Sequence, residues 1–134
     1  MIEITQQPIS PEAVISQVKT ASSGCVITYV GLIRQYSRGK LVSAVEYGDP
    51  NGEAENHLRE IANQTKQKWL LENIAICHRI GRLGVGEINL VIAIASVHRK
   101  EGFAACQYAI NQFKEKLPTL KRETYQDGSV RVES

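Results

Sequence analysis

The segment Ser96-Val97-His98-Arg99-Lys100 is the strongest local indication of a functional site. It lies where an apolar run, typical of a strand, gives way to a pattern typical of a helix. Free backbone N–H groups at a helix start, a guanidinium and an imidazole together suit the binding of a phosphate or a carboxylate. The alternative is that Arg99 and Lys100 are solvated surface charges and that His98 only ends the strand. The segment alone favours neither interpretation.

Lys114 and Lys121 form a second candidate group, because Pro118 lies between them. Proline ends a helix, so the chain can fold back here and bring together a lysine on a helix and a lysine on a strand. Two ammonium groups that are held close and partly desolvated can act as proton donors, proton acceptors or nucleophiles near neutral pH. Taken alone, these lysines are better explained as surface residues, one of them at the favourable end of a helix dipole.

Arg34 is a third candidate, because it follows Gly31-Leu32-Ile33 at the end of an apolar run. Its guanidinium can bind an anion in bidentate geometry, or it can simply be solvated. For His78 and Arg79 we favour a structural role within a pair of strands. The three histidines are scattered without metal-ligand spacing, and the chain has neither a P-loop nor a G-x-S-x-G motif. We therefore expect a site without metal or cofactor.

Length and composition restrict the fold and the class of function. At 134 residues and 43% hydrophobic content, the chain fits one domain, residues 1–134, with a substantial core. Its formal net charge is only +2 and its aromatic content is 6%, so neither a general attraction to nucleic acid nor the stacking of bases is indicated. Any anion-binding site must therefore be local.

The sequence carries no signal for a membrane or for export. No apolar stretch approaches the roughly 20 residues that a membrane-spanning helix needs, and residues 1–10 lack the basic and apolar regions of a signal peptide. We therefore expect a cytoplasmic protein. The three cysteines, Cys25, Cys77 and Cys106, stand singly in apolar segments, which predicts buried, reduced thiols.

Hydrophobic periodicity and breaker residues predict the secondary structure. Ser10-Pro11-Glu12 predicts the start of a helix that ends near residues 22–24. Further helices are predicted over 54–69 and 99–116, strands over 25–33, 41–47, 73–80 and 88–96, and two short strands around a turn at 126–128.

The strand pattern also predicts pairing. Strands 25–33 and 41–47 are expected to form an antiparallel pair across the basic turn 37–40. Strand 88–96 is nearly all apolar and is expected in the middle of a sheet. Together these elements predict an α+β domain with mainly antiparallel pairing.

The candidate residues belong to four motifs whose order and separation carry further information. The motifs are Gly31-Leu32-Ile33-Arg34; His78-Arg79-Ile80-Gly81-Arg82-Leu83 with Gly86-Glu87; Ser96-Val97-His98-Arg99; and Lys114 with Pro118-Thr119-Leu120-Lys121-Arg122-Glu123. Together they resemble the large-subunit family of molybdopterin synthase, from about Gly24 to the C-terminal end. Two features differ from the family's usual pattern: Leu120 stands where a tryptophan is usual, and Gly48–Glu53 replaces an acidic stretch that contains tyrosine and methionine.

The resemblance implies a fold and an activity. The fold is α+β of the α/β-hammerhead type, with a mainly antiparallel sheet in a single domain. The activity is that of a sulfurtransferase, which moves sulfur from the thiocarboxylated Gly-Gly tail of a small ubiquitin-like carrier subunit to cyclic pyranopterin monophosphate and so forms the molybdopterin dithiolene. The expected assembly is a homodimer that binds two carriers as a heterotetramer.

The resemblance also assigns roles to the candidate residues. Lys114 and Lys121 match the family's catalytic lysines, while Arg34, His98 and Arg99 match its anion-binding residues. Because the pocket lies at the dimer interface in this family, some of these residues are expected to serve the neighbouring subunit. Since sulfur arrives on the carrier, the chain needs no cysteine nucleophile.

Two other classes of function stay open on the sequence alone. One is a diverged, non-catalytic paralogue that still binds the sulfur carrier, which an activity assay with a thiocarboxylated carrier would distinguish. The other is a small nucleic-acid-binding domain, which the nearly balanced charge and low aromatic content disfavour.

Overall fold

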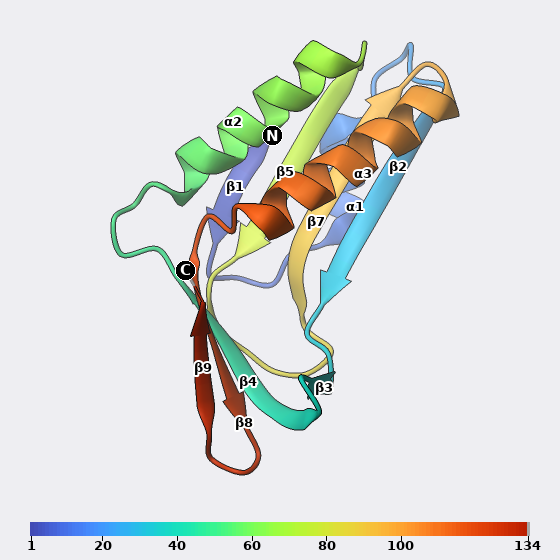
Figure 1. Ribbon diagram of the computed structural model, residues 1–134. Helices are drawn as coiled ribbons and strands as arrows, with labels where there is room; N and C mark the ends of the chain where they lie inside the picture. Colours follow the sequence, from blue (N-terminus) through green and yellow to red (C-terminus); the bar gives the residue numbers. More distant parts are fainter. Residues whose placement is uncertain (134) are drawn as a thin grey trace.

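Three helices and nine strands form the part of the chain that the computed structural model describes, residues 1–133 (Figure 1). In chain order they are β1 (Ile2–Thr5), α1 (Pro11–Val18), β2 (Cys25–Leu32), β3 (Tyr36–Ser37), β4 (Lys40–Gly48), α2 (Ala54–Lys68), β5 (Asn73–Arg79), β6 (Gly81–Leu83), β7 (Ile88–Ser96), α3 (Arg99–Glu115), β8 (Leu120–Tyr125) and β9 (Val130–Glu133). They build a larger sheet that carries the helices and a smaller sheet that projects below it in Figure 1.

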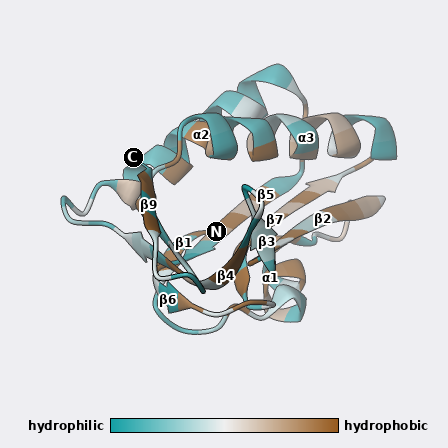
Figure 2. Ribbon diagram, turned by 60° about the horizontal axis from the view of Figure 1, so that its bottom comes forward, coloured by the Kyte–Doolittle hydropathy of each residue, from teal (hydrophilic) through white to brown (hydrophobic). Residues whose placement is uncertain are grey.

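The larger sheet has the strand order β1-β5-β7-β2. β7 pairs antiparallel with β5 and with β2, whereas β1 runs parallel to β5. Alternate residues from Leu90 to Ile94 pack with α2 and α3, and alternate residues from Val91 to Ala95 pack with α1. β7 is apolar from Leu90 to Ala95, where both of its faces are covered, so its predicted central position is confirmed. Figure 2 shows these central strands as mainly hydrophobic, beneath the largely hydrophilic α2.

Local side-chain contacts explain where the first two helices begin. Ser10 accepts a hydrogen bond from the backbone N–H of Ala13 at 3.2 Å, the N-cap contact that the sequence predicts. At α2 the carboxylate of Asp49 accepts hydrogen bonds from the backbone N–H groups of Glu53 and Ala54, at 3.1 and 3.2 Å. These contacts satisfy backbone donors that a helix start would otherwise leave unpaired.

The smaller sheet has the order β3-β4-β8-β9, and β6 also pairs with β4. All its pairs are antiparallel. It has a core of its own, formed by Ile33, Val42, Val45, Tyr47, Leu83 and Tyr125. The observed structure therefore confirms the α+β fold with mainly antiparallel sheets.

Two details of the sequence prediction are wrong. The strands predicted over 25–33 and 41–47 do not pair with each other, because β2 pairs with β7 and β4 pairs with β3, β6 and β8. The β2 register shifts at Gly31/Leu32, and Ile33 already packs in the core of the smaller sheet.

The first helix ends at Val18 rather than near residues 22–24. Lys19 has extended backbone angles, and the side chain of Ser23 accepts a hydrogen bond from the backbone N–H of Thr20 at 3.0 Å. Such side-chain contacts compete with the helix for backbone groups.

Candidate functional site

A cavity of about 490 Å³ lies where the end of β2, the last turn of α3 and the smaller sheet meet. Its volume is in the range of sites for small molecules. It is lined by Tyr29, Val30, Gly31, Leu32, Ile33, Arg34, Ser37, Val45, Tyr47, Asn89, Leu90, Phe113, Lys114, Lys121 and Glu123. Residues from two sheets and a helix therefore contribute to one site.

Three of the predicted site residues, Arg34, Lys114 and Lys121, line this cavity. Lys114 lies in the last turn of α3, and Lys121 is the second residue of β8. The chain reverses between them through a short turn that contains Pro118, as the sequence predicts. The structure therefore brings the two lysines to the same cavity from two different elements.

The other two predicted site residues, His98 and Arg99, are exposed at the opposite end of α3. A rise of about 1.5 Å per residue separates Arg99 from Lys114 by roughly 22 Å along the helix. Neither His98 nor Arg99 lines the cavity of its own chain. A site that used all five residues would therefore need a second copy of the chain.

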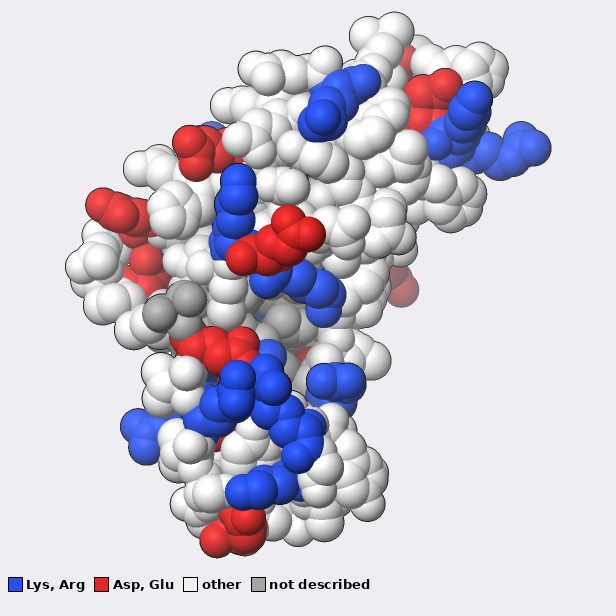
Figure 3. Space-filling view, viewed as in Figure 1, with Lys and Arg blue, Asp and Glu red and all other residues white. Residues whose placement is uncertain are grey.

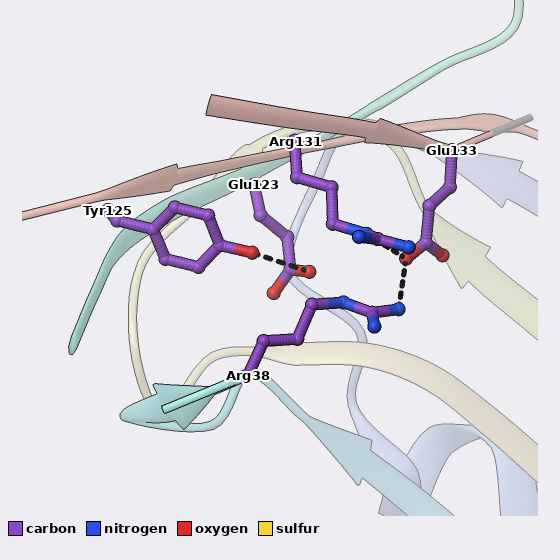
Figure 4. Close-up of polar contacts among 5 residues, drawn as sticks. All are labelled: Arg38, Glu123, Tyr125, Arg131 and Glu133. Atoms are coloured by element: carbon purple, nitrogen blue, oxygen red, sulfur yellow. Dashed lines mark hydrogen bonds and ion pairs between the residues drawn. The ribbon is translucent and has the colours of Figure 1, made fainter. Parts of the chain in front are cut away.

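The cavity also contains a buried carboxylate that the sequence reasoning did not select. Glu123 is 5% exposed and lies two residues after Lys121 on β8, so both side chains point to the same side of the strand. The hydroxyl of Tyr125 donates a hydrogen bond to Glu123 at 3.4 Å (Figure 4). Alternation along β8 is the signal that could have identified Glu123.

Positive charge gathers on the smaller sheet, as the Lys and Arg side chains in the lower part of Figure 3 show. Some of it is paired: Glu133 accepts hydrogen bonds from Arg38 at 3.0 Å and from Arg131 at 3.2 Å (Figure 4). The hydrogen bond from Arg38 is the largest influence and lowers the pKa of the Glu133 carboxyl below its usual value; partial burial opposes it, and the contact with Arg131 adds to the lowering. The carboxylate therefore stays ionised beside its two guanidinium partners.

Within residues 1–133, by contrast, no salt bridge joins Arg34, Lys114 or Lys121 to a carboxylate. Their positive charges are therefore available to an anionic ligand in the cavity.

Two polar side chains form part of the inner wall. The side-chain amide of Asn89 donates a hydrogen bond to the hydroxyl of Tyr47 at 3.2 Å. Burial raises the pKa of Tyr47 to about 12, so the phenol is neutral and keeps its own proton to donate. No local pattern predicts this pair, because Tyr47 and Asn89 lie far apart in the sequence and only the fold brings them together.

The cysteines are free thiols. Burial raises the pKa of both Cys77 and Cys106 to about 11, which leaves them protonated and poorly nucleophilic at neutral pH. Cys25 is only partly buried, which corrects the prediction that all three are buried. None of the three lines the cavity.

In the described residues no cluster of His, Cys, Asp or Glu could hold a metal ion. None of the helices in this part of the chain is long and apolar enough to cross a membrane.

Comparisons with known proteins identify the family. The chain matches the family model described as MoaE protein over residues 4–116. It is 34% identical over 128 residues to a Thermoplasma volcanium protein named molybdopterin synthase catalytic subunit, which covers 96% of this chain and 93% of the relative. A Bacillus subtilis protein with the same name is 37% identical over 126 residues, which covers 94% of this chain and 80% of the relative.

A solved structure shows the same fold. The crystal structure of molybdopterin synthase from Staphylococcus aureus matches with a TM-score of 0.91 and 31% sequence identity, covering 99% of this chain and 96% of that chain. The resemblance carried by the four sequence motifs is thereby confirmed, and the chain belongs to the MoaE protein family.

Proposed function

We propose that this chain is a molybdopterin synthase catalytic subunit, a sulfurtransferase that forms the dithiolene of molybdopterin from cyclic pyranopterin monophosphate. The observation that carries the proposal is the cavity itself, in which Arg34, Lys114 and Lys121 converge and form no salt bridge within residues 1–133. Relatives over nearly the whole chain bear this name. A cationic cavity suits a substrate that carries a phosphate and a sulfur donor that is an anion.

The residues divide the work by their chemistry. Arg34 binds the substrate phosphate or the carrier's thiocarboxylate, because a guanidinium keeps its charge and offers bidentate contacts. Lys114 and Lys121 move protons and stabilise negative charge as oxygen leaves and sulfur enters. The free cysteines take no part, because the sulfur arrives on the carrier and none of these thiols reaches the cavity.

The partner in this proposal is a small ubiquitin-like carrier whose Gly-Gly thiocarboxylate tail enters the cavity. The proposed assembly is a homodimer with a carrier at each end, in the cytoplasm. The term catalytic subunit in the relatives' names agrees with a second kind of subunit.

The open edge of β2 offers a route to the dimer. β2 is the last strand of the larger sheet, and the exposed apolar side chains Val30, Leu32 and Phe103 lie on β2 and α3. Antiparallel pairing of two β2 strands about a two-fold axis would place the start of one α3 beside the end of the other β2. In such a dimer, His98 and Arg99 of one subunit would lie near the cavity of the other and complete its anion site.

The activity is tested by incubating the purified chain with cyclic pyranopterin monophosphate and a thiocarboxylated carrier and then measuring molybdopterin. We expect product from the wild type and from the control variant Lys66→Ala, which changes an exposed lysine on α2. We expect almost no product from Lys121→Ala. Carrier binding without any product from the wild type would instead indicate the non-catalytic paralogue.

Shared sites are tested by mixing two inactive variants, His98→Ala and Lys121→Ala. A mixed dimer keeps one intact site if His98 serves the neighbouring subunit, so random mixing should restore about a quarter of wild-type activity. No recovery above the two parent variants would show that His98 does not act across the interface.

A further inference from the structure

His78 is fully buried in β5 behind the cavity, which it does not itself line. Its ring meets the ring of Tyr47 edge-on, with centroids 4.8 Å apart, and that of Phe113 in the same way at 5.0 Å. Both Tyr47 and Phe113 line the cavity. His78 therefore supports two cavity walls from behind.

Two hydrogen bonds fix the orientation of this imidazole. Nδ1 lies 2.8 Å from the backbone oxygen of Asn89, and Nε2 lies 2.9 Å from the hydroxyl of Thr119. A carbonyl oxygen can only accept, so Nδ1 carries the proton and donates it. Burial lowers the pKa of His78 to about 4, so at neutral pH the ring is uncharged and Nε2 accepts from the Thr119 hydroxyl.

Three residues that contact His78, namely Phe113, Tyr47 and Thr119, connect it to the two cavity lysines. Phe113 immediately precedes Lys114 on α3. Tyr47 is the cross-strand partner of Lys121 in the pairing of β4 with β8. Thr119 is buried in the turn that separates the two lysines, two residues before Lys121. The imidazole thus holds the helix, the strand pair and the turn that together place both ammonium groups.

We propose that His78 is a positioning residue that sets the spacing of Lys114 and Lys121. Hydrogen bonds are directional, so the imidazole fixes the turn in a way that an apolar ring cannot. The inference rests on the proposed function for the role of the two lysines, but the arrangement itself can be tested without activity.

The kinetic test changes Thr119, the residue that donates a hydrogen bond to Nε2 of His78. It compares Thr119→Val with Thr119→Ser. Valine keeps the shape but deletes the hydroxyl, whereas serine keeps the hydroxyl. Thr65→Val is the matched control, since Thr65 is also buried, donates a 2.7 Å hydrogen bond to the backbone oxygen of Ile61, and lies outside the cavity.

Thr119→Val should lower kcat by roughly 10- to 100-fold, as expected for displaced catalytic groups, with little change in KM for the carrier. Thr119→Ser should stay within a few-fold of wild type, and Thr65→Val should be unchanged. Wild-type kcat in Thr119→Val, or an equal loss in Thr65→Val, would overturn the inference.

Nuclear magnetic resonance separates failure of this inference from failure of the proposed function. In protein labelled at lysine Cε, the signals of Lys114 and Lys121 should move in Thr119→Val and stay in place in Thr65→Val, whether or not the chain makes product. Unchanged lysine signals would overturn the inference even if the wild type is active. If Thr119→Val does not fold, the imidazole nitrogen chemical shifts of His78 in the wild type test the inference instead. A ring protonated at Nε2 rather than Nδ1 would contradict the hydrogen bonds to Asn89 and Thr119.

Discussion

Acidification from pH 7 to pH 4.5 is expected to destabilise the fold mainly through His78. Burial lowers the pKa of this imidazole from 6.5 to about 4, partly offset by its hydrogen bond to Asn89 and by the charge of Asp49. The unfolded chain therefore takes up a proton at a higher pH than the folded chain does. The stabilisation is fully present above pH 6.5 and is lost as the pH falls toward 4.

The size of the effect follows from the same two values. At about 1.4 kcal/mol for each pH unit, the gap between 6.5 and about 4 corresponds to about 3 kcal/mol, most of it lost by pH 4.5. The carboxyls with lowered pKa values contribute at lower pH, because the pKa falls from 3.8 to about 2 for Asp127 and from 4.5 for Glu133. The window between pH 6.5 and 4.5 therefore isolates the histidine.

Urea unfolding followed by the fluorescence of Trp69, the single tryptophan, measures the free energy of unfolding at each pH. The double variant His57→Gln, His98→Gln leaves His78 as the remaining histidine and should keep the full pH dependence. A free energy of unfolding that is flat between pH 6.5 and 4.5 in the wild type would refute the reasoning. A dependence that disappears in the double variant would assign it to the exposed histidines instead.

Three further predictions concern chemistry and packing. Lys121→Ala should keep carrier binding but lose roughly 10²-fold or more in turnover, and Lys121→Arg should not restore it, because arginine does not readily give up a proton; good turnover by Lys121→Arg would reduce the role to charge alone. Replacing all three cysteines by alanine should leave sulfur transfer per folded molecule largely intact, and an inactive but folded variant would contradict the proposal that sulfur arrives on the carrier. Gly102→Ala should lower the free energy of unfolding by about 1–3 kcal/mol, measured by urea unfolding, because its Cβ would lie 2.7 Å from Ser96 Oγ and 2.9 Å from Ile27.

Local patterns predicted most elements of the fold but not all of their partners. The extent of β7 and its central position followed from a nearly continuous apolar run, which is typical of a strand with both faces buried. The partner of β2 did not follow, because the sequences of β4 and β7 are both typical of strands and either could pair with it. The choice depends on which core each strand fills, and those contacts join residues that lie far apart in the sequence. The short strand β6 was missed because three residues carry no period.

The site was predictable where it depends on local chain geometry. The turn at Pro118 placed Lys114 and Lys121 at one cavity, as expected. Glu123 follows Lys121 and Arg122 in the sequence and resembles a surface charge there, yet the fold buries it. Alternation along β8 places Glu123 on the same side of the strand as Lys121, but whether that side is buried depends on neighbours that lie far away in the sequence.

His98 and Arg99 illustrate a further limit. The sequence correctly placed them at the start of α3, where free backbone N–H groups favour anions. The length of α3 then separates them from the cavity of the same chain by roughly 22 Å. No property of one chain can bring the two groups together, so a common site requires the symmetry of an assembly. If the proposed dimer forms through β2, the length of α3 sets the distance over which one subunit supplies His98 and Arg99 to the other. A change in that length should then impair the shared anion site while leaving the lysine pair in place.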